Sequence, residues 1–141
     1  MANPKRLIAT PAEARALHDG GTVEVWRAMK PQPKPPSHTT EIDLHSLDNG
    51  ALGFYDDNRD YVCPFPTGSR WWVAETYGPC DGGFCYQASE GKDAKPDGGR
   101  WFSPATMFRD ASRTIAEVIA CRVELREGVW HWVANMKGEK V

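Results

Sequence analysis

Residues 64–78 read PFPTGSRWWVAETYG, and this stretch decides the fold expected for the chain. A Pro-Thr-Gly turn leads into an apolar run at 71–74, which stops abruptly at Glu75, Thr76 and Tyr77. A short apolar run bounded by turn residues is typical of a buried strand. The segment therefore places aromatic side chains beside a carboxylate and a hydroxyl. It forms either the core of a small β-barrel or the wall of a pocket for a flat ligand.

Length and composition predict one folded domain over residues 1–141. A chain of this size with 40% apolar residues and six Trp can build a packed core. No stretch reaches the roughly 18 apolar residues of a membrane span, and the N-terminal residues lack the apolar part of a signal peptide. We therefore expect a cytoplasmic protein with no membrane partner. A net charge of −2 argues against coating of nucleic acid by bulk electrostatics.

The four cysteines, Cys63, Cys80, Cys85 and Cys121, are expected to be free thiols, because nothing in the sequence directs the chain to an oxidising compartment. Cys80 and Cys85 have four residues between them, a spacing that zinc permits although it is wider than a usual zinc knuckle. The histidines are scattered. We expect no metal and no cofactor.

The N-terminal segment predicts a strand, a capped helix and a second strand. Residues 7–10 are apolar and extended in character, and Thr10 with Glu13 has the spacing of a capping box. Pro11 suits the first helical position, and the glycines at 20–21 end the helix. Residues 22–29 alternate with period two, which indicates a strand.

Turn-rich segments divide the rest of the chain. They are a Pro-rich loop at 31–38, an acidic insertion at 39–62 with one basic and six acidic residues, and a flexible loop at 88–99. Further strands are expected near 52–54, at 70–77, 84–86, 114–125 and 129–133, with a short helical piece within 107–113. Many short strands with one or two short helices predict an α+β, mainly β fold, a small mixed β-barrel.

Three blocks of sequence, in order, cover about half of the chain. The first is RLIATPAEARALHDG (6–20) together with WRAMKPQP (26–33), and the second is the stretch at 64–78. The third is residues 101–128, in which WFSP, Met107, Arg109 and ASR precede IAEVIACRVELREG. Together they resemble phage and prophage proteins of the ASCH group (activating signal cointegrator homology), whose fold is a PUA-like β-barrel. The resemblance implies a cleft that receives RNA, a nucleotide or a modified base in a bacterial host cell.

The chain departs from that family at the catalytic block. Some ASCH members resemble small amidohydrolases that deacylate a modified cytidine with Lys, Thr and Glu, and in these an opening Gly precedes Arg-Lys-Thr-x-Thr-x-Arg. Here Thr22 stands in place of the Lys and Val25 in place of the second Thr, and Ser69 replaces an Asp of the second block. Neither Thr22 nor Val25 can supply the base or the activated hydroxyl. The departures point away from this hydrolase activity.

Glu75 is the candidate catalytic residue. A carboxylate at the end of an apolar strand can have a raised pKa and act as acid or base. The alternative is a structural carboxylate that pairs with Arg113 or Arg27.

The candidate binding residues combine aromatic and basic side chains. Trp71 and Trp72 face opposite sides of a regular strand, and we expect Trp72 in the core and Trp71 toward a ligand. Aromatic rings stack on bases, while guanidinium, ammonium and hydroxyl groups hold phosphate. The set is Arg27, Lys30, Trp71, Tyr77, Tyr86, Trp101, Arg109, Ser112 and Arg113, although core packing or an ion pair explains any single member equally well.

Three functions stay open on the sequence. The first is binding of RNA or a modified nucleotide with little or no catalysis. The second is a nucleoside amidohydrolase or ribonuclease that uses Glu75. The third is a protein-interaction module that acts on a host factor through the acidic insertion.

Overall fold

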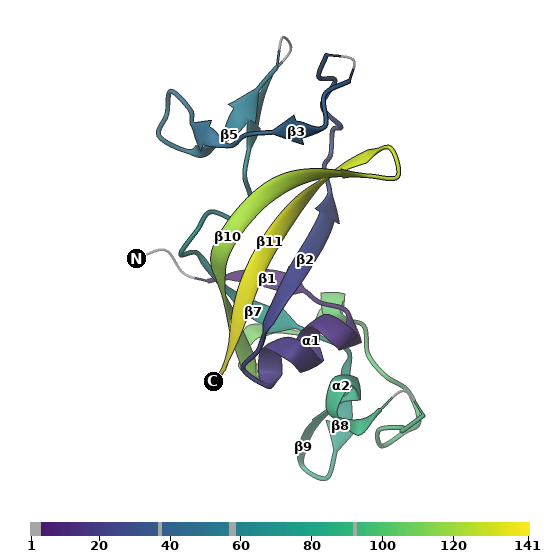
Figure 1. The fold of residues 1–141 in the computed structure, drawn as a ribbon. Helices are drawn as coiled ribbons and strands as arrows, with labels where there is room; N and C mark the ends of the chain where they lie inside the picture. Colours follow the sequence, from purple (N-terminus) through teal and green to yellow (C-terminus); the bar gives the residue numbers. More distant parts are fainter. Residues whose placement is uncertain (1–3, 37, 57–58, 92) are drawn as a thin grey trace. The chain divides into compact units, whose positions relative to one another are not determined.

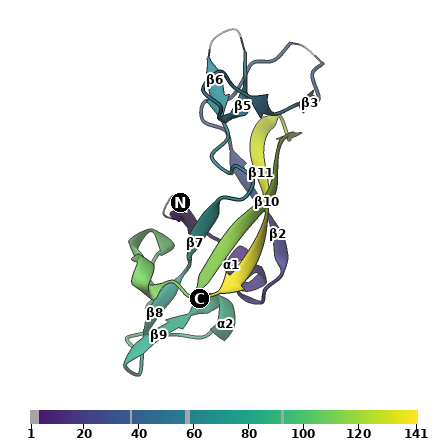
Figure 2. The same cartoon turned by 90° about the vertical axis from the view of Figure 1, so that its left-hand side faces the viewer.

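The computed structural model describes residues 4–36, 38–56, 59–91 and 93–141 (Figures 1 and 2). Strands predominate and are accompanied by two short α-helices, which confirms the small α+β class. The chain divides into two compact units. The first unit comprises Met1–Val23, Arg70–Glu117 and Lys137–Val141, and the second comprises Glu24–Ser69 and Val118–Met136.

The sheet of the first unit is built around the apolar run at 71–74. Strand β1 (Lys5–Ile8) pairs in parallel with β7 (Arg70–Ala74), and Leu7 lies opposite Val73. On its other edge β7 pairs antiparallel with the start of β10 (Thr114–Arg126). The predicted strand at 70–77 ends earlier, at Ala74, and Glu75 and Thr76 lie outside any strand.

Helix α1 (Pro11–His18) begins with the predicted capping box. The Thr10 hydroxyl accepts a hydrogen bond from the Glu13 amide, and the Glu13 carboxylate accepts one from the Thr10 amide. Ala14 and Leu17 are fully buried, so one face of the helix lies against the unit's core.

A second group of elements lies between β7 and β10 in sequence. The hairpin of β8 (Tyr77–Cys80) and β9 (Gly83–Tyr86) leads into the single turn of α2 (Gln87–Glu90), which contacts α1 (Figure 1). Two 3-10 turns follow, η1 (Pro104–Thr106) and η2 (Arg109–Ala111). The flexible loop predicted at 88–99 thus begins inside a helix, and its residue 92 lies outside the described residues.

The second unit contains most of the short strands. Its elements are β2 (Thr22–Ala28), β3 (Glu41–Ile42), β4 (His45–Ser46), β5 (Leu52–Tyr55), β6 (Asp60–Val62), the later part of β10, and β11 (Val129–Lys140). Strands β2, β10 and β11 also reach into the first unit. Strands β4, β5 and β6 form a separate antiparallel sheet, and β3 pairs with β10. Glu127 and Gly128 both have positive φ, as a two-residue hairpin turn requires between β10 and β11.

The expected closed barrel is not formed by the described strands. Hydrogen-bonded neighbours follow the open order β1-β7-β10-β11-β2, while β4–β6 and β8–β9 form sheets of their own. The last strand is also longer than predicted, because β11 continues from Val133 to Lys140. Within the predicted acidic insertion, residues 57–58 lie outside the described residues.

The expectation for the two tryptophans of β7 is wrong. Trp71 is the buried one at 8% exposure and shares its face with Val73, whereas Trp72 is half-buried. Trp72 packs on the other face, against a cluster of Ala74, Tyr77, Met107 and Ala111. Because both faces of β7 are covered, alternation alone could not identify the side that faces the core.

Gly138 of β11 provides a test of how α1 packs in the first unit. Its amide donates to the Gly21 carbonyl at 3.1 Å, and a Cβ at this position would overlap the backbone of Leu17. We expect Gly138→Ala to lower the free energy of unfolding by about 1–3 kcal/mol through overpacking. Urea denaturation measures the change. Gly83→Ala is the matched control, since its Cβ would meet nothing nearer than the Cys80 carbonyl at 3.9 Å, and equal losses would contradict the packing.

Candidate functional site

In the first unit the buried Glu75 forms an ion pair with Arg113, whose side chain is 18% exposed. Glu75 follows the last residue of β7, and its side chain is 1% exposed. Arg113 immediately precedes β10, and its guanidinium donates through Nε to Oε2 at 3.1 Å and through a terminal nitrogen to Oε1 at 3.0 Å. This two-point geometry is the strongest form of carboxylate recognition. Of the two roles left open for Glu75, the structure shows the pairing with Arg113.

The Arg113 side chain has further partners from the hairpin and from helix α2, which follows it. Its remaining terminal nitrogen donates to the Ser89 hydroxyl at 2.6 Å. Its guanidinium carbon lies 4.2 Å from the centre of the Tyr86 ring, and the Tyr86 hydroxyl donates to the Ala111 carbonyl at 2.6 Å. Burial and the negative charge of Glu75 raise the pKa of Tyr86, so its hydroxyl stays protonated. Arg113 is therefore held on several sides.

His18 extends this polar group from the end of α1. Its Nδ1 and the hydroxyl of the fully buried Thr114 are 2.9 Å apart. Burial lowers the pKa of His18 below its ordinary value of 6.5, and the positive charges of Arg113 and Lys140 lower it further. Glu75 and Asp19 act in the opposite direction but do not outweigh these effects. His18 is thus mainly neutral at pH 7.

A small hollow opens beside these groups, between α1 and α2. It has a volume of about 180 Å³ and is lined by Arg15, His18, Asp19, Ala88 and Ser89. Ligand pockets for drug-sized molecules usually measure about 300–1,000 Å³, so this hollow cannot enclose a whole nucleoside. Its charged rim suits a small polar group, but Asp19 opposes an anion.

A second feature of the first unit is a patch of exposed aromatic rings. We call Phe84, Phe102 and Phe108 the phenyl patch; their exposed fractions are 43%, 40% and 57%. The rings of Phe84 and Phe102 pack edge to face on the buried Tyr77, at centroid distances of 5.7 and 5.4 Å. Phe84 also contacts Phe108 at 6.2 Å. The three rings are therefore linked: Phe84 contacts Phe108 directly and shares the buried Tyr77 with Phe102.

The local backbone explains why these rings meet. Tyr77 and Phe102 exchange two backbone hydrogen bonds, of 2.7 and 3.3 Å. A disulfide between Cys80 and Cys85 closes the hairpin that carries Phe84. The Tyr77 hydroxyl lies 3.2 Å from the Thr106 carbonyl, which ties η1 to the same place. The phenyl patch thus rests on a fixed backbone.

Several predicted binding residues serve the internal structure of the first unit. The Ser112 hydroxyl donates to the Val73 carbonyl at 2.8 Å, and the Trp101 indole donates to the Ala94 carbonyl at 2.9 Å. Trp71 and Tyr77 are buried, so neither presents a ring face to a ligand. Arg109, in contrast, is exposed next to Phe108.

The two remaining predicted residues belong to the second unit. The Arg27 guanidinium donates to the Trp26 carbonyl at 2.8 Å, and Lys30 is exposed. The phenyl rings, which the sequence reasoning missed, lie on the first unit instead. A signal for Phe84 existed: it stands in a short Gly-rich hairpin, two residues after the turn at Asp81 and Gly82, where the chain offers little to cover it.

The cysteines differ from the expectation of four free thiols. Cys80 and Cys85 are bonded to each other, because the hairpin pairs Gly78 with Cys85 and Cys80 with Gly83 and so brings their side chains together. Cys63 and Cys121 are free. Among the residues that the structure describes, no group of three or more His, Cys, Asp or Glu side chains could hold a metal ion.

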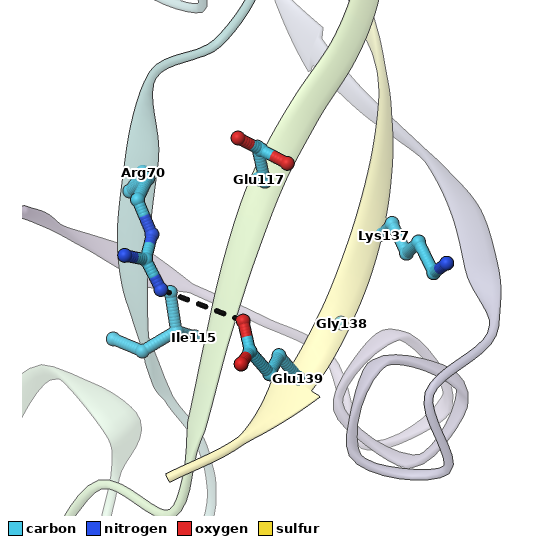
Figure 3. A pocket seen from close by; sticks show the side chains of 6 residues that line it. All are labelled: Arg70, Ile115, Glu117, Lys137, Gly138 and Glu139. Atoms are coloured by element: carbon cyan, nitrogen blue, oxygen red, sulfur yellow. Dashed lines mark ion pairs between the residues drawn. The ribbon is translucent and has the colours of Figure 1, made fainter.

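A broader hollow of about 490 Å³ lies on the strands of the first unit, as Figure 3 shows. Its charged side chains are two bases, Arg70 and Lys137, and two acids, Glu117 and Glu139. Arg70 is turned toward Glu139, 3.5 Å away, and both are largely exposed. Because the positive and negative charges balance, the hollow favours neither an anionic nor a cationic ligand.

Comparison of the chain with protein-family models, curated proteins and solved structures found no match in any of the three. In the described part of the chain, none of the helices is long and apolar enough to cross a bilayer. Inferences about function therefore depend on the chemistry of the site and on the sequence motifs.

The buried pair is expected to stabilise the first unit strongly. Glu75→Gln removes the charge that compensates Arg113, and breaking a buried pair in this way typically costs about 3–5 kcal/mol of unfolding free energy. Urea denaturation checks this value. Glu139→Gln is the matched control, because the exposed pair with Arg70 is worth at most about 1 kcal/mol. Similar losses in the two variants would contradict a structural role for Glu75.

His18 should make folding weaken in mild acid. Since its pKa is lowered in the folded state, both states are neutral above pH 6.5, and the unfolded chain takes up the proton first as the pH falls. The stability that His18 contributes is thus present above pH 6.5 and is lost as the pH falls through the folded pKa. Denaturation of wild type and His18→Asn across this range checks the prediction. Parallel pH profiles for the two proteins would overturn it.

Proposed function

We propose that the chain binds single-stranded RNA, as a small α+β domain of the ASCH, PUA-like kind, and that the phenyl patch stacks the bases. The observation that carries this proposal is the exposure of Phe84, Phe102 and Phe108 as a linked group of rings around Tyr77. Single exposed apolar side chains are common on protein surfaces, whereas contiguous apolar patches mark sites of interaction. Every base has a flat π face, so such rings bind bases with little regard to sequence.

Basic side chains near the patch favour a nucleic acid over an uncharged ligand. Arg109 follows Phe108 directly and is exposed. The Arg6 guanidinium donates to the Ala105 carbonyl at 3.0 Å, which places a second positive charge beside η1. Asp110 follows Arg109, and Asp97 meets Asp81 of the hairpin that carries Phe84, so the two guanidinium groups act as individual phosphate contacts and not as a basic surface. Binding of this type should weaken as salt rises, because phosphate contacts release counterions.

The geometry of Glu75 favours binding over hydrolysis. Both of its carboxylate oxygens accept hydrogen bonds from Arg113, and with 1% exposure the side chain has little access to a substrate. The positions that would supply a Lys and a Thr hold Thr22 and Val25. A hydrolase in which Glu75 acts as base would first have to break the pair with Arg113.

Binding can be measured by the fluorescence anisotropy of a labelled single-stranded RNA of about ten nucleotides at low salt. We expect Phe108→Ala and Phe84→Ala each to remove about 1–3 kcal/mol of stacking energy, which weakens Kd by about 5- to 150-fold. Arg109→Gln should reduce the slope of log Kd against log salt concentration by about one, because one phosphate contact is lost.

Tyr55→Ala is the matched control, because Tyr55 is 67% exposed but belongs to the second unit. It should leave the RNA affinity unchanged. Absence of RNA binding by the wild type would overturn the proposal, as would an equal loss in the Tyr55 and Phe108 variants. If the phenyl substitutions left the RNA affinity unchanged, the patch would not be the RNA site, and a protein partner would be the alternative ligand for it.

A further inference from the structure

The second unit holds two free thiols in direct contact. Cys63 follows β6 immediately, and Cys121 lies within β10. Their sulfur atoms are 3.0 Å apart, about 1 Å more than the length of a disulfide bond. The residues are 58 positions apart in sequence, so only the fold brings them together.

We propose that Cys63 and Cys121 form a thiol-oxidation site, which a hydroperoxide converts into a reversible disulfide. The contact distance makes the second sulfur available as soon as the first is oxidised. Cys121 is partly exposed and gives a small oxidant a route to the pair, whereas Cys63 is buried at 4% exposure. Because Cys63 is buried, larger thiols cannot reach it, and once oxidised it can form a disulfide only with Cys121.

The hydrogen bond between the thiols determines which sulfur reacts first with the hydroperoxide. It lowers the pKa of Cys63, because the Cys121 thiol donates to the Cys63 thiolate once that forms. The same bond, together with burial, raises the pKa of Cys121. Cys63 is thus the sulfur that carries the negative charge and attacks, and the thiolate is the nucleophilic form of cysteine.

The chemistry balances with one hydroperoxide. The Cys63 thiolate attacks the peroxide oxygen, the O–O bond breaks, and an alcohol leaves after it takes up a proton, so that Cys63 becomes a sulfenic acid. The Cys121 sulfur then attacks the oxidised sulfur and loses its proton, and water leaves. The sum is two thiols and one hydroperoxide giving one disulfide, one alcohol and one water, with hydrogen peroxide giving a second water in place of the alcohol.

A metal is a weaker alternative for this pair. Zinc held by protein alone takes four ligands, and catalytic zinc takes three. The described residues offer no group of three or more candidate ligands, so the two sulfurs have no partners with which to complete a site.

The test uses the full chain treated with hydrogen peroxide and then with iodoacetamide, followed by digestion without reductant and mass spectrometry. We expect a peptide that links Cys63 to Cys121, formed at a rate independent of protein concentration and reversed by dithiothreitol. The Cys80–Cys85 pair serves as an internal reference, since it is already bonded and does not react with iodoacetamide before reduction.

Cys121→Ser is the control variant, because Cys121 is partly exposed and the serine is close in size. Oxidant should raise the melting midpoint of the wild type relative to this variant by at least about 5 °C, since the new bond constrains the unfolded chain. Full labelling of Cys63 and Cys121 after peroxide treatment would overturn the proposal. Disulfides formed only between separate molecules would overturn it equally.

Discussion

The ion pair between Glu75 and Arg113 is the constraint on which the first unit depends. A carboxylate with 1% exposure is unstable without a partner, because the desolvation of a charge costs several kcal/mol. Its partner comes from 38 residues further along the chain, so the end of β7 and the start of β10 must meet. Arg113 then reaches Ser89 and Tyr86, which draws α2 and the hairpin to the same centre.

This constraint also places the exposed aromatic surface. Tyr77 is two residues beyond Glu75, so fixing the carboxylate fixes the start of β8. Tyr86 joins the two features, since it carries Arg113 on its ring and packs on the cluster that contains Tyr77. The phenyl patch therefore rests on a polar centre that is itself buried. A ligand on those rings would meet a surface already arranged for it, which lowers the entropy lost on binding.

Local sequence signals predicted the secondary-structure elements well, whereas long-range packing decides which side chains are buried and which partners they have. The capping box at Thr10 and the hairpin around Cys80 and Cys85 depend only on neighbouring residues, and both form. The assignment of Trp71 and Trp72 failed because β7 is covered on both faces, and no local pattern records which layer covers which side. Glu75 was identified as a notable residue for its type and position, but the choice of Arg113 as partner depends on the fold. The exposure of the phenyl rings depends on it in the same way.

The departure at the catalytic block and the state of Glu75 are independent observations that favour the same class of function. Thr22 and Val25 stand where the resemblance to ASCH proteins would place a Lys and a Thr, which is a property of the sequence alone. The two hydrogen bonds from Arg113 occupy the carboxylate, which is a property of the fold. Hydrogen bonds to charged groups are worth about 1.5–3 kcal/mol each, so freeing Glu75 for proton transfer would require several kcal/mol before any chemistry began. Stacking on exposed rings requires no such rearrangement, which is why we propose binding and not hydrolysis.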